Sequence, residues 1–264
     1  MRKFIAITIL GLVSFSCEKV IQIPLNEADQ KIVVEGQLYD IQYESFVKVS
    51  KTGSVYDNSE FEKMTGASVV ITDNQGGSFI FEEDPLEAGT YRDTSFVAQP
   101  NRVYNLTVTL GTDVYTSTSE TFSAVTLDSL SYDLQVGGFG QDPNDTTYFT
   151  FFSLTDNAAE TNFYNVIPFI NGEAGSEYLN KDQLFNGNAY TQPFFSDEFR
   201  SGDTCTAYLI SMDEANYDFK SSLLNNQDNG PFSPTPANPV SNIEGGGLGF
   251  FGAYITDNLT IIYP

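Results

Sequence analysis

The chain of 264 residues has no histidine, no tryptophan, only 2 cysteines and few basic side chains. Without imidazole, Ser-His-Asp and Cys-His hydrolases are excluded, as are HExxH metalloproteases and most catalytic zinc sites. Two cysteines cannot form a disulfide-rich framework. The 12 basic residues stand against 35 acidic ones, for a net charge of -23. We therefore expect no nucleic acid partner, because phosphate binding relies on clustered Lys and Arg.

Apolar residues make up 41% of the chain, and 22 Phe and 15 Tyr supply most of the bulk. This composition is sufficient for packed cores and argues against global disorder. The length allows one large domain or two small ones.

Residues 1–16 have the pattern of a lipoprotein signal peptide. Arg2 and Lys3 precede an apolar run of 10 residues at 4–13, which is too short to span a bilayer. Cys17 follows this run, and we expect it to be acylated and to hold the protein on a membrane. The alternative is an ordinary signal peptide cut near Ser16. Residues 17–30 then read as a short tether.

Short alternating runs broken by turn residues fill 31–124. Alternation with period two and β-branched or aromatic residues predicts strands. The predicted strands are 31–38, 45–52, 67–73, 78–83, 89–96, 102–110 and 113–122. Seven strands at this spacing are typical of an immunoglobulin-like β-sandwich.

Residues 125–264 predict a second β-rich domain with one short helix. Its predicted strands are 127–136, 147–156, 161–172, 202–212 and 253–263. The helix is expected near 213–227, because Asp213 and Glu214 suit a helix N-terminus and apolar residues then recur at helical spacing. The fold class is therefore mainly β.

The segment 229–252 holds four prolines and then a glycine cluster, so we expect neither a regular helix nor a central strand there. One interpretation is an irregular crossing segment pinned by apolar residues. The other is a contact surface for a partner, since such loops often carry function. The candidate contact residues are Phe232, Leu248, Phe250 and Phe251.

Dense aromatic pairs occur at Tyr148-Phe149, Phe151-Phe152 and Phe194-Phe195 as well. Consecutive residues of a strand point to opposite faces, so one ring of each pair is expected in the core and the other on the surface.

Hard oxygen ligands for calcium alternate in one loop, at Asp142, Asn144 and Asp145. The complete EF-hand pattern is absent, so an ordinary turn is the favoured interpretation, and no resident metal or cofactor is expected. Cys205, in a strand, is interpreted as a small buried apolar residue, because no histidine could activate its thiol.

Acidic side chains lie close in sequence at Asp197, Glu198 and Asp203, and again at 82–84. A glycosidase needs two opposed carboxylates at a defined separation, which a sequence does not reveal. With 35 acids in the chain, solvated surface is the favoured interpretation.

The order of several segments resembles one family, the domain of unknown function 4249. They are CEKVIQIPLNEADQKIVVEGQL at 17–38, VKVSKTGSVYDNSEFEKMTGASVVITDNQG at 47–76, GTYRDTSFVAQPNRVYNLTVTL at 89–110, GDTCTAYLISMDEANYDF at 202–219 and NPVSNIEGGGLGFFGAY at 238–254. The resemblance implies a lipoprotein of a Gram-negative outer membrane whose partner is a TonB-dependent receptor. It transfers no catalytic residue.

These observations favour a lipid-anchored, non-enzymatic binding or accessory protein at the cell surface that assists such a receptor in nutrient capture. Two alternatives stay open at this point. One is a surface glycoside hydrolase that uses two carboxylates. The other is a structural or adhesive lipoprotein.

Overall fold

Residues 29–53, 61–136, 146–227 and 238–264 are described by a computed structural model of the chain. Cys17, Phe232 and the predicted calcium loop at 142–145 lie outside these ranges. The described residues are mainly β, as the sequence predicted, and they form a 12-stranded and a 4-stranded sheet.

The first half supplies seven strands, and each lies within or closely matches a predicted one. They are β1 (Ile32–Tyr39), β2 (Phe46–Lys51), β3 (Ser68–Asp73), β4 (Ser78–Glu83), β5 (Thr90–Arg92), β6 (Val103–Leu110) and β7 (Asp113–Glu120). Their pairing follows one continuous path, β1-β2-β5-β4-β3-β6-β7. Alternate residues such as Val34, Val47, Ile71 and Leu106 point into a shared first core.

The second half places two layers of strands over a second core. One layer, the smaller sheet, contains β8 (Leu127–Val136), β9 (Thr146–Thr155), β13 (Ala189–Pro193) and β14 (Phe199–Arg200). The other belongs to the larger sheet and contains β10 (Phe163–Ile170), β11 (Glu173–Ala174), β12 (Tyr178–Lys181), β15 (Thr204–Met212) and β16 (Leu248–Ile262). A short 3-10 helix, η1 (Asp182–Leu184), follows β12. Aromatic residues such as Phe152, Phe194 and Phe199 fill the space between the layers.

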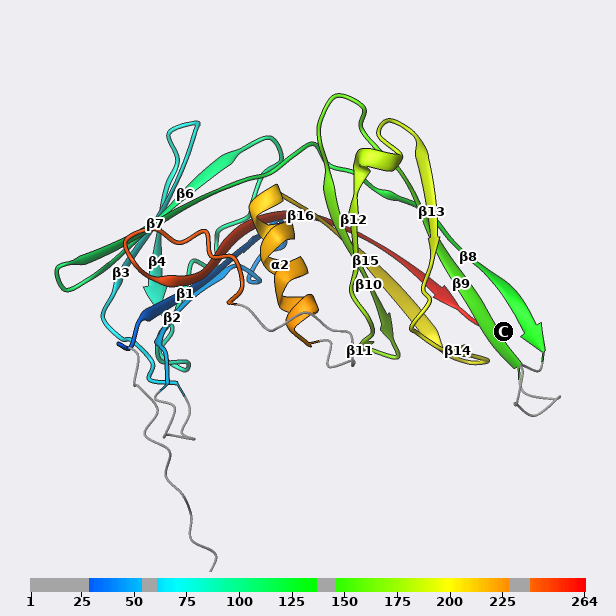
Figure 1. The fold of residues 1–264 in the computed structure, drawn as a ribbon, viewed down its shortest axis with the longest axis horizontal. Helices are drawn as coiled ribbons and strands as arrows, with labels where there is room; N and C mark the ends of the chain where they lie inside the picture. Colours follow the sequence, from blue (N-terminus) through cyan, green and yellow to red (C-terminus); the bar gives the residue numbers. More distant parts are fainter. Residues whose placement is uncertain (1–28, 54–60, 137–145, 228–237) are drawn as a thin grey trace, which may run out of the picture.

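The long strand β16 belongs to both halves, and Figure 1 shows it (red) running across the molecule. Residues 248–254 pair in parallel with β1, and residues 255–262 pair antiparallel with β15. The expectation of irregular structure throughout 229–252 is therefore wrong for its last five residues. Position 249 of this central strand requires glycine. The φ of Gly249 is 110°, and a Cβ there would lie 2.0 Å from the carbonyl oxygen of Val34.

The helix α2 (Glu214–Gln227) starts one residue after the predicted position and packs on β16. Phe219 stacks on Phe250 with ring centroids 4.3 Å apart. Gly252 lies beneath the first turn, where a Cβ would approach the side-chain oxygen of Asn216 to 2.4 Å. A small residue at this place in β16 is thus what lets the helix pack close to the sheet, and Figure 1 shows α2 in front of the sheet.

The two cores are not separated in sequence at residue 124. Ile243, Phe251 and Ala253 pack in the first core, although they come after most of the second half in the chain. The two-domain division and the immunoglobulin-like topology stay predictions. Among the described helices, none combines the length and the apolar character needed to cross a membrane.

Candidate functional site

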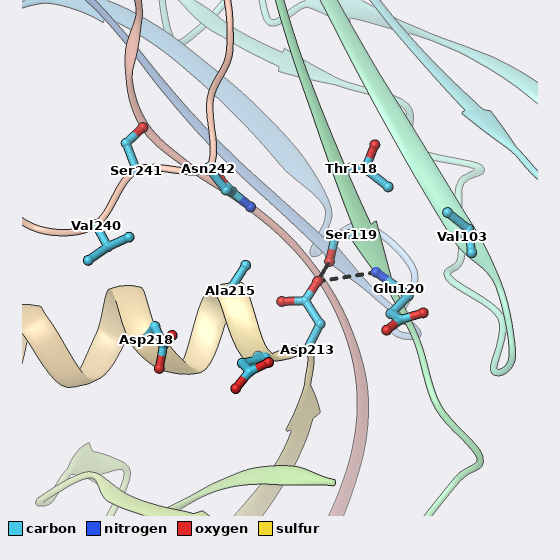
Figure 2. A pocket seen from close by; sticks show the side chains of 11 residues that line it. Val103, Thr118, Ser119, Glu120, Asp213, Ala215, Asp218, Val240, Ser241 and Asn242 are labelled. Atoms are coloured by element: carbon cyan, nitrogen blue, oxygen red, sulfur yellow. Dashed lines mark hydrogen bonds between the residues drawn. The ribbon is translucent and has the colours of Figure 1, made fainter. Parts of the chain in front are cut away.

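A hollow of about 520 Å³ lies where β7, the start of α2 and the segment 240–242 meet. Figure 2 shows its lining, with Asp213 at the centre and Asn242 on the opposite side. Several lining side chains are acidic, namely Glu120, Asp213, Glu214 and Asp218. The chemistry of the hollow therefore depends on whether these carboxylates are available.

Asp213 is fully engaged by hydrogen-bond donors. Its Oδ1 accepts from the backbone N–H of Asn216 at 2.8 Å and from the amide Nδ2 of the same residue at 2.6 Å. Its Oδ2 accepts from the hydroxyl of Ser119 and from the N–H of Glu120 at 3.2 Å, drawn as dashed lines in Figure 2. The N–H bond three residues into the helix makes Asp213 an N-cap. These four donors, with the helix dipole, stabilise a carboxylate that is only 6% exposed.

The bonds around Asp213 continue into a buried group that we call the junction network, formed by Ser119, Asp213, Asn216 and Tyr254. The hydroxyl of Ser119 also accepts from the N–H of Ala253 at 2.9 Å. The hydroxyl of Tyr254 donates to Oδ1 of Asn216 at 3.2 Å, and burial raises the pKa of this tyrosine well above its usual range. The network ties β7, α2 and β16 together.

This geometry gives Asp213 a structural role. Asp213 has no open lone pair for substrate or metal, and Glu214 and Asp218 lie 4.0 and 3.7 Å from the ammonium of Lys181. In the described ranges, no three potential His, Cys, Asp or Glu ligands gather where they could hold a metal ion.

A second hollow of about 530 Å³ has a somewhat more apolar lining, and we call it the open-face cleft. It lies on the face of the larger sheet that carries α2, because Tyr39 pairs in register with Tyr254 and the hydroxyl of Tyr254 bonds to Asn216 of the helix. Both halves of the molecule line it. Its lining is Gln37, Tyr39, Ile41, Glu44, Phe46, Ile167, Phe169, Tyr208, Ile210 and Thr256.

Four aromatic rings define the open-face cleft. Phe169 and Tyr208 meet edge to face with centroids 5.2 Å apart. Tyr39 packs on Tyr254 at 5.1 Å, and its pKa is raised to about 12 by burial and then by the charges of Glu44 and Glu177. The four rings that line the cleft, Tyr39, Phe46, Phe169 and Tyr208, are only partly buried, whereas Tyr254 is 2% exposed and is not part of the lining. The cleft thus offers aromatic surface with a carboxylate at its edge, as ligand sites commonly do.

The turn between β1 and β2 forms one rim of this cleft. Ile41 and Tyr43 are 41% and 62% exposed. Tyr43 has φ of 72°, in the left-handed region that bulky residues avoid, at a cost of about 1–2 kcal/mol. Backbone strain of this kind clusters at binding sites and switches, so it supports a role for the turn in recognition.

The predicted partner-contact residues are placed differently from the expectation. Phe251 is fully buried in the first core, and Phe250 is 9% exposed beneath α2. Alternation does put them on opposite faces, but both faces are covered. Leu248 is half-buried opposite Val33, and Phe232 lies outside the described residues. The rings at 250 and 251 are therefore not available to a partner in this structure.

The other aromatic pairs follow the alternation. Tyr148 and Phe152 are buried in the second core, while Phe149 and Phe151 meet edge to face on the outer side of β9. Phe194 is 1% exposed and its neighbour in the chain, Phe195, is 67% exposed. Cys205 is fully buried, and burial raises the pKa of its thiol to about 11.

Most of the acids in these clusters bind backbone N–H groups, a neighbouring hydroxyl or neighbouring bases. Asp197 accepts from the N–H of Ser176 and from the hydroxyl of Tyr178, and Glu198 pairs with Arg200. Asp203 closes a turn through the N–H of Arg200. In the cluster at 82–84, one carboxylate receives the N–H groups of two glycines and another pairs with Arg92.

Comparison with known proteins identifies the family of the chain. By fold the described part of the chain is mainly β, with two cores, an α-helix packed on β16 and an open aromatic cleft. The chain belongs to the domain of unknown function 4249 family, whose family model matches residues 18–259. No curated protein matches the chain.

Proposed function

We propose that the protein is a lipid-anchored binding or accessory protein of the outer membrane, which assists a TonB-dependent receptor in capturing a nutrient. The observation that carries this proposal is the open-face cleft, an aromatic surface assembled from both halves and left uncovered by α2. Aromatic residues are enriched in the cores of protein interfaces.

The N-terminal pattern supports the anchoring step. Acylation of Cys17 would attach fatty chains, each stabilised by about 0.8 kcal/mol for every CH₂ group buried in the bilayer. A body with net charge -23 has no electrostatic attraction to anionic lipid, so the acyl chains supply the attachment.

Metabolic labelling with a clickable fatty acid tests the anchor. The native chain and the Cys205→Ala variant should take up label, because the second cysteine is buried and unmodified in the fold. The Cys17→Ala variant should take up none. Equal labelling of the native and Cys17→Ala chains would remove the anchor from this proposal.

Co-purification from gently solubilised outer membranes tests the accessory role. We expect a β-barrel receptor to accompany the native chain in its own organism. The cleft variant Tyr208→Ala should reduce this recovery, whereas Phe195→Ala, an exposed ring away from the cleft, should not. Absence of any receptor in the native sample would count against the accessory role and favour an adhesive one.

A further inference from the structure

The open-face cleft has the composition of a protein-binding hot spot. Tyr39, Phe46, Phe169 and Tyr208 provide rings, and branched apolar side chains fill the spaces between them. Tyr and Phe are the types that interface cores accumulate, while charges are depleted there. The exposed Ile41 and Tyr43 extend this apolar surface beyond the cleft along the β1–β2 turn.

The charged residues around the cleft differ in whether they already have a partner. The Nζ of Lys48 and the Cζ of Arg92 lie 5.3 and 5.5 Å from the ring centroid of Phe46. Each of these cations is already paired with a carboxylate. Lys48 binds Glu87 at 2.8 Å, and Arg92 lies 3.3 Å from Asp84. These cations are thus neutralised within the protein.

Glu44 differs from those acids because, in the part of the chain that the structure describes, its carboxylate makes no hydrogen bond or ion pair. It lies at the edge of the aromatic surface, close enough to raise the pKa of Tyr39. A positive group in the cleft would be its first partner.

A further acceptor lies next to the cleft. The side-chain oxygen of Asn165 is completely buried and has no hydrogen-bond partner in the described structure, while its Nδ2 donates to Glu177. Asn165 is two residues from Ile167 on the same face of β10 and pairs with Ile210, and both of these line the cleft. The buried Asn165 oxygen lies beneath this surface, so Glu44 is the acceptor that a partner's donor could reach.

We propose that the open-face cleft binds an apolar segment of a partner protein that carries arginine. A guanidinium has five donors and no acceptor, stacks on Tyr and Phe rings, and pairs with a carboxylate, which matches the aromatic lining and Glu44. The net charge of -23 favours the same partner over a second copy of this chain. This inference deepens the proposed function by stating the chemistry of the surface that the receptor would present.

The lack of tryptophan in the chain makes a direct binding assay available, because a tryptophan in a peptide can be observed selectively. The probes are three amidated peptides: Arg-Trp-Arg-Leu-Arg, its Gln counterpart Gln-Trp-Gln-Leu-Gln and its Glu counterpart Glu-Trp-Glu-Leu-Glu. The full chain is titrated in mild detergent, with empty micelles as the blank. We expect a saturable blue shift of tryptophan emission with the Arg peptide, weaker binding of the Gln peptide and none of the Glu peptide.

Variants locate the binding site. Glu44→Gln should weaken binding of the Arg peptide by about fivefold. Tyr208→Ala should weaken it by about tenfold, as for an aromatic anchor, and Phe195→Ala should leave it unchanged. Far-UV circular dichroism confirms that each variant is folded. Equal binding of the Arg and Gln peptides, or equal binding by native and Tyr208→Ala chains, would overturn the inference.

Cellohexaose, added in place of the peptides, tests a glycan as the occupant. A saturable change of tyrosine fluorescence with the sugar, abolished by Tyr208→Ala, would overturn the inference in favour of a sugar site. The peptide assay and the receptor co-purification distinguish failure of the inference from failure of the proposed function. If the receptor is recovered equally with Tyr208→Ala, the inference fails and the accessory role stands; if the Arg peptide binds but no receptor is recovered, the reverse holds.

Discussion

The hydroxyl of Ser119 in β7 donates a hydrogen bond to the carboxylate of Asp213, 94 residues later in the chain. The same carboxylate caps α2 through the N–H of Asn216. The side chain of Asp213 therefore follows the end of β15, caps the start of α2 and binds β7, the edge strand of the first half.

Replacing Asp213 by alanine should lower the free energy of unfolding by about 2–4 kcal/mol. About 1 kcal/mol comes from the lost cap, and the rest from the buried hydroxyl of Ser119 and the partly buried N–H of Glu120, which lose their acceptor. Urea denaturation followed by circular dichroism measures the change. Asp218→Ala is the control, since this exposed acid in the same helix makes only a long ion pair with Lys181. The interpretation fails if the two variants lose equal stability.

A second prediction concerns the close approach of β16 to β1. Gly249 and Gly76 both have positive φ, but an added Cβ meets the Val34 backbone only at Gly249, whereas nothing lies within 4 Å at Gly76. Gly249→Ala should therefore destabilise the chain by more than about 1 kcal/mol beyond the loss for Gly76→Ala. Comparison of their urea midpoints, with slopes checked, gives the difference.

Because β16 is shared, the loss at Gly249 should reach both cores. Hydrogen exchange in Gly249→Ala should accelerate in β3 and in β9 by the same factor, as for one cooperative unit. Acceleration confined to β3 would show that the two cores unfold independently.

Much of this fold could be predicted from local sequence. Period-two alternation marked β1 to β4 and β6 to β9 closely, and the start of α2 was predictable because the cap at Asp213 acts over three residues. The prediction of an apolar helix face was less accurate, since Leu223 is 38% exposed and Phe219 makes the ring contact with the sheet.

What the sequence could not reveal is long-range. The first residues of β16 look irregular because of Gly249 and Gly252, and those glycines make sense only once Val34 and Asn216 lie against them. The open-face cleft was missed for the same reason. Tyr39 and Tyr208 are ordinary alternating strand residues, and only the pairing of β1 with β16 and of β16 with β15 brings them to one surface.

Alkaline titration should detect the tyrosines whose pKa is raised by burial. Burial, followed by the charges of Glu44 and Glu177, raises the pKa of Tyr39 to about 12. The pKa of Tyr178 is also raised to about 12, chiefly by burial. Since the fold favours the neutral phenol, its contribution to stability is complete below the unfolded pKa of about 10 and is lost as pH rises to about 12. Urea stability should fall across this window.

Tyrosinate absorbance in the near ultraviolet checks the assignment. The difference between native and Tyr39→Phe chains isolates one phenol, and Glu44→Gln should shift its titration downward because one of the raising charges is removed. An unchanged midpoint in Glu44→Gln would contradict the placement of that carboxylate beside Tyr39.

The thiol of Cys205 should be unreactive until the chain unfolds. It is fully buried in the second core, and burial raises its pKa to about 11. The raised pKa alone lowers the thiolate fraction at neutral pH about 100-fold relative to an exposed cysteine, and the thiolate is the nucleophile. In a Cys17→Ala background, a disulfide reagent should therefore label the native chain at least that much more slowly than the chain in urea. Ser201→Cys in the same background provides an exposed thiol in the adjacent turn, which should react at once. Equal rates for the two thiols in the folded chain would mean that the packing of β15 between β10 and β16 opens readily.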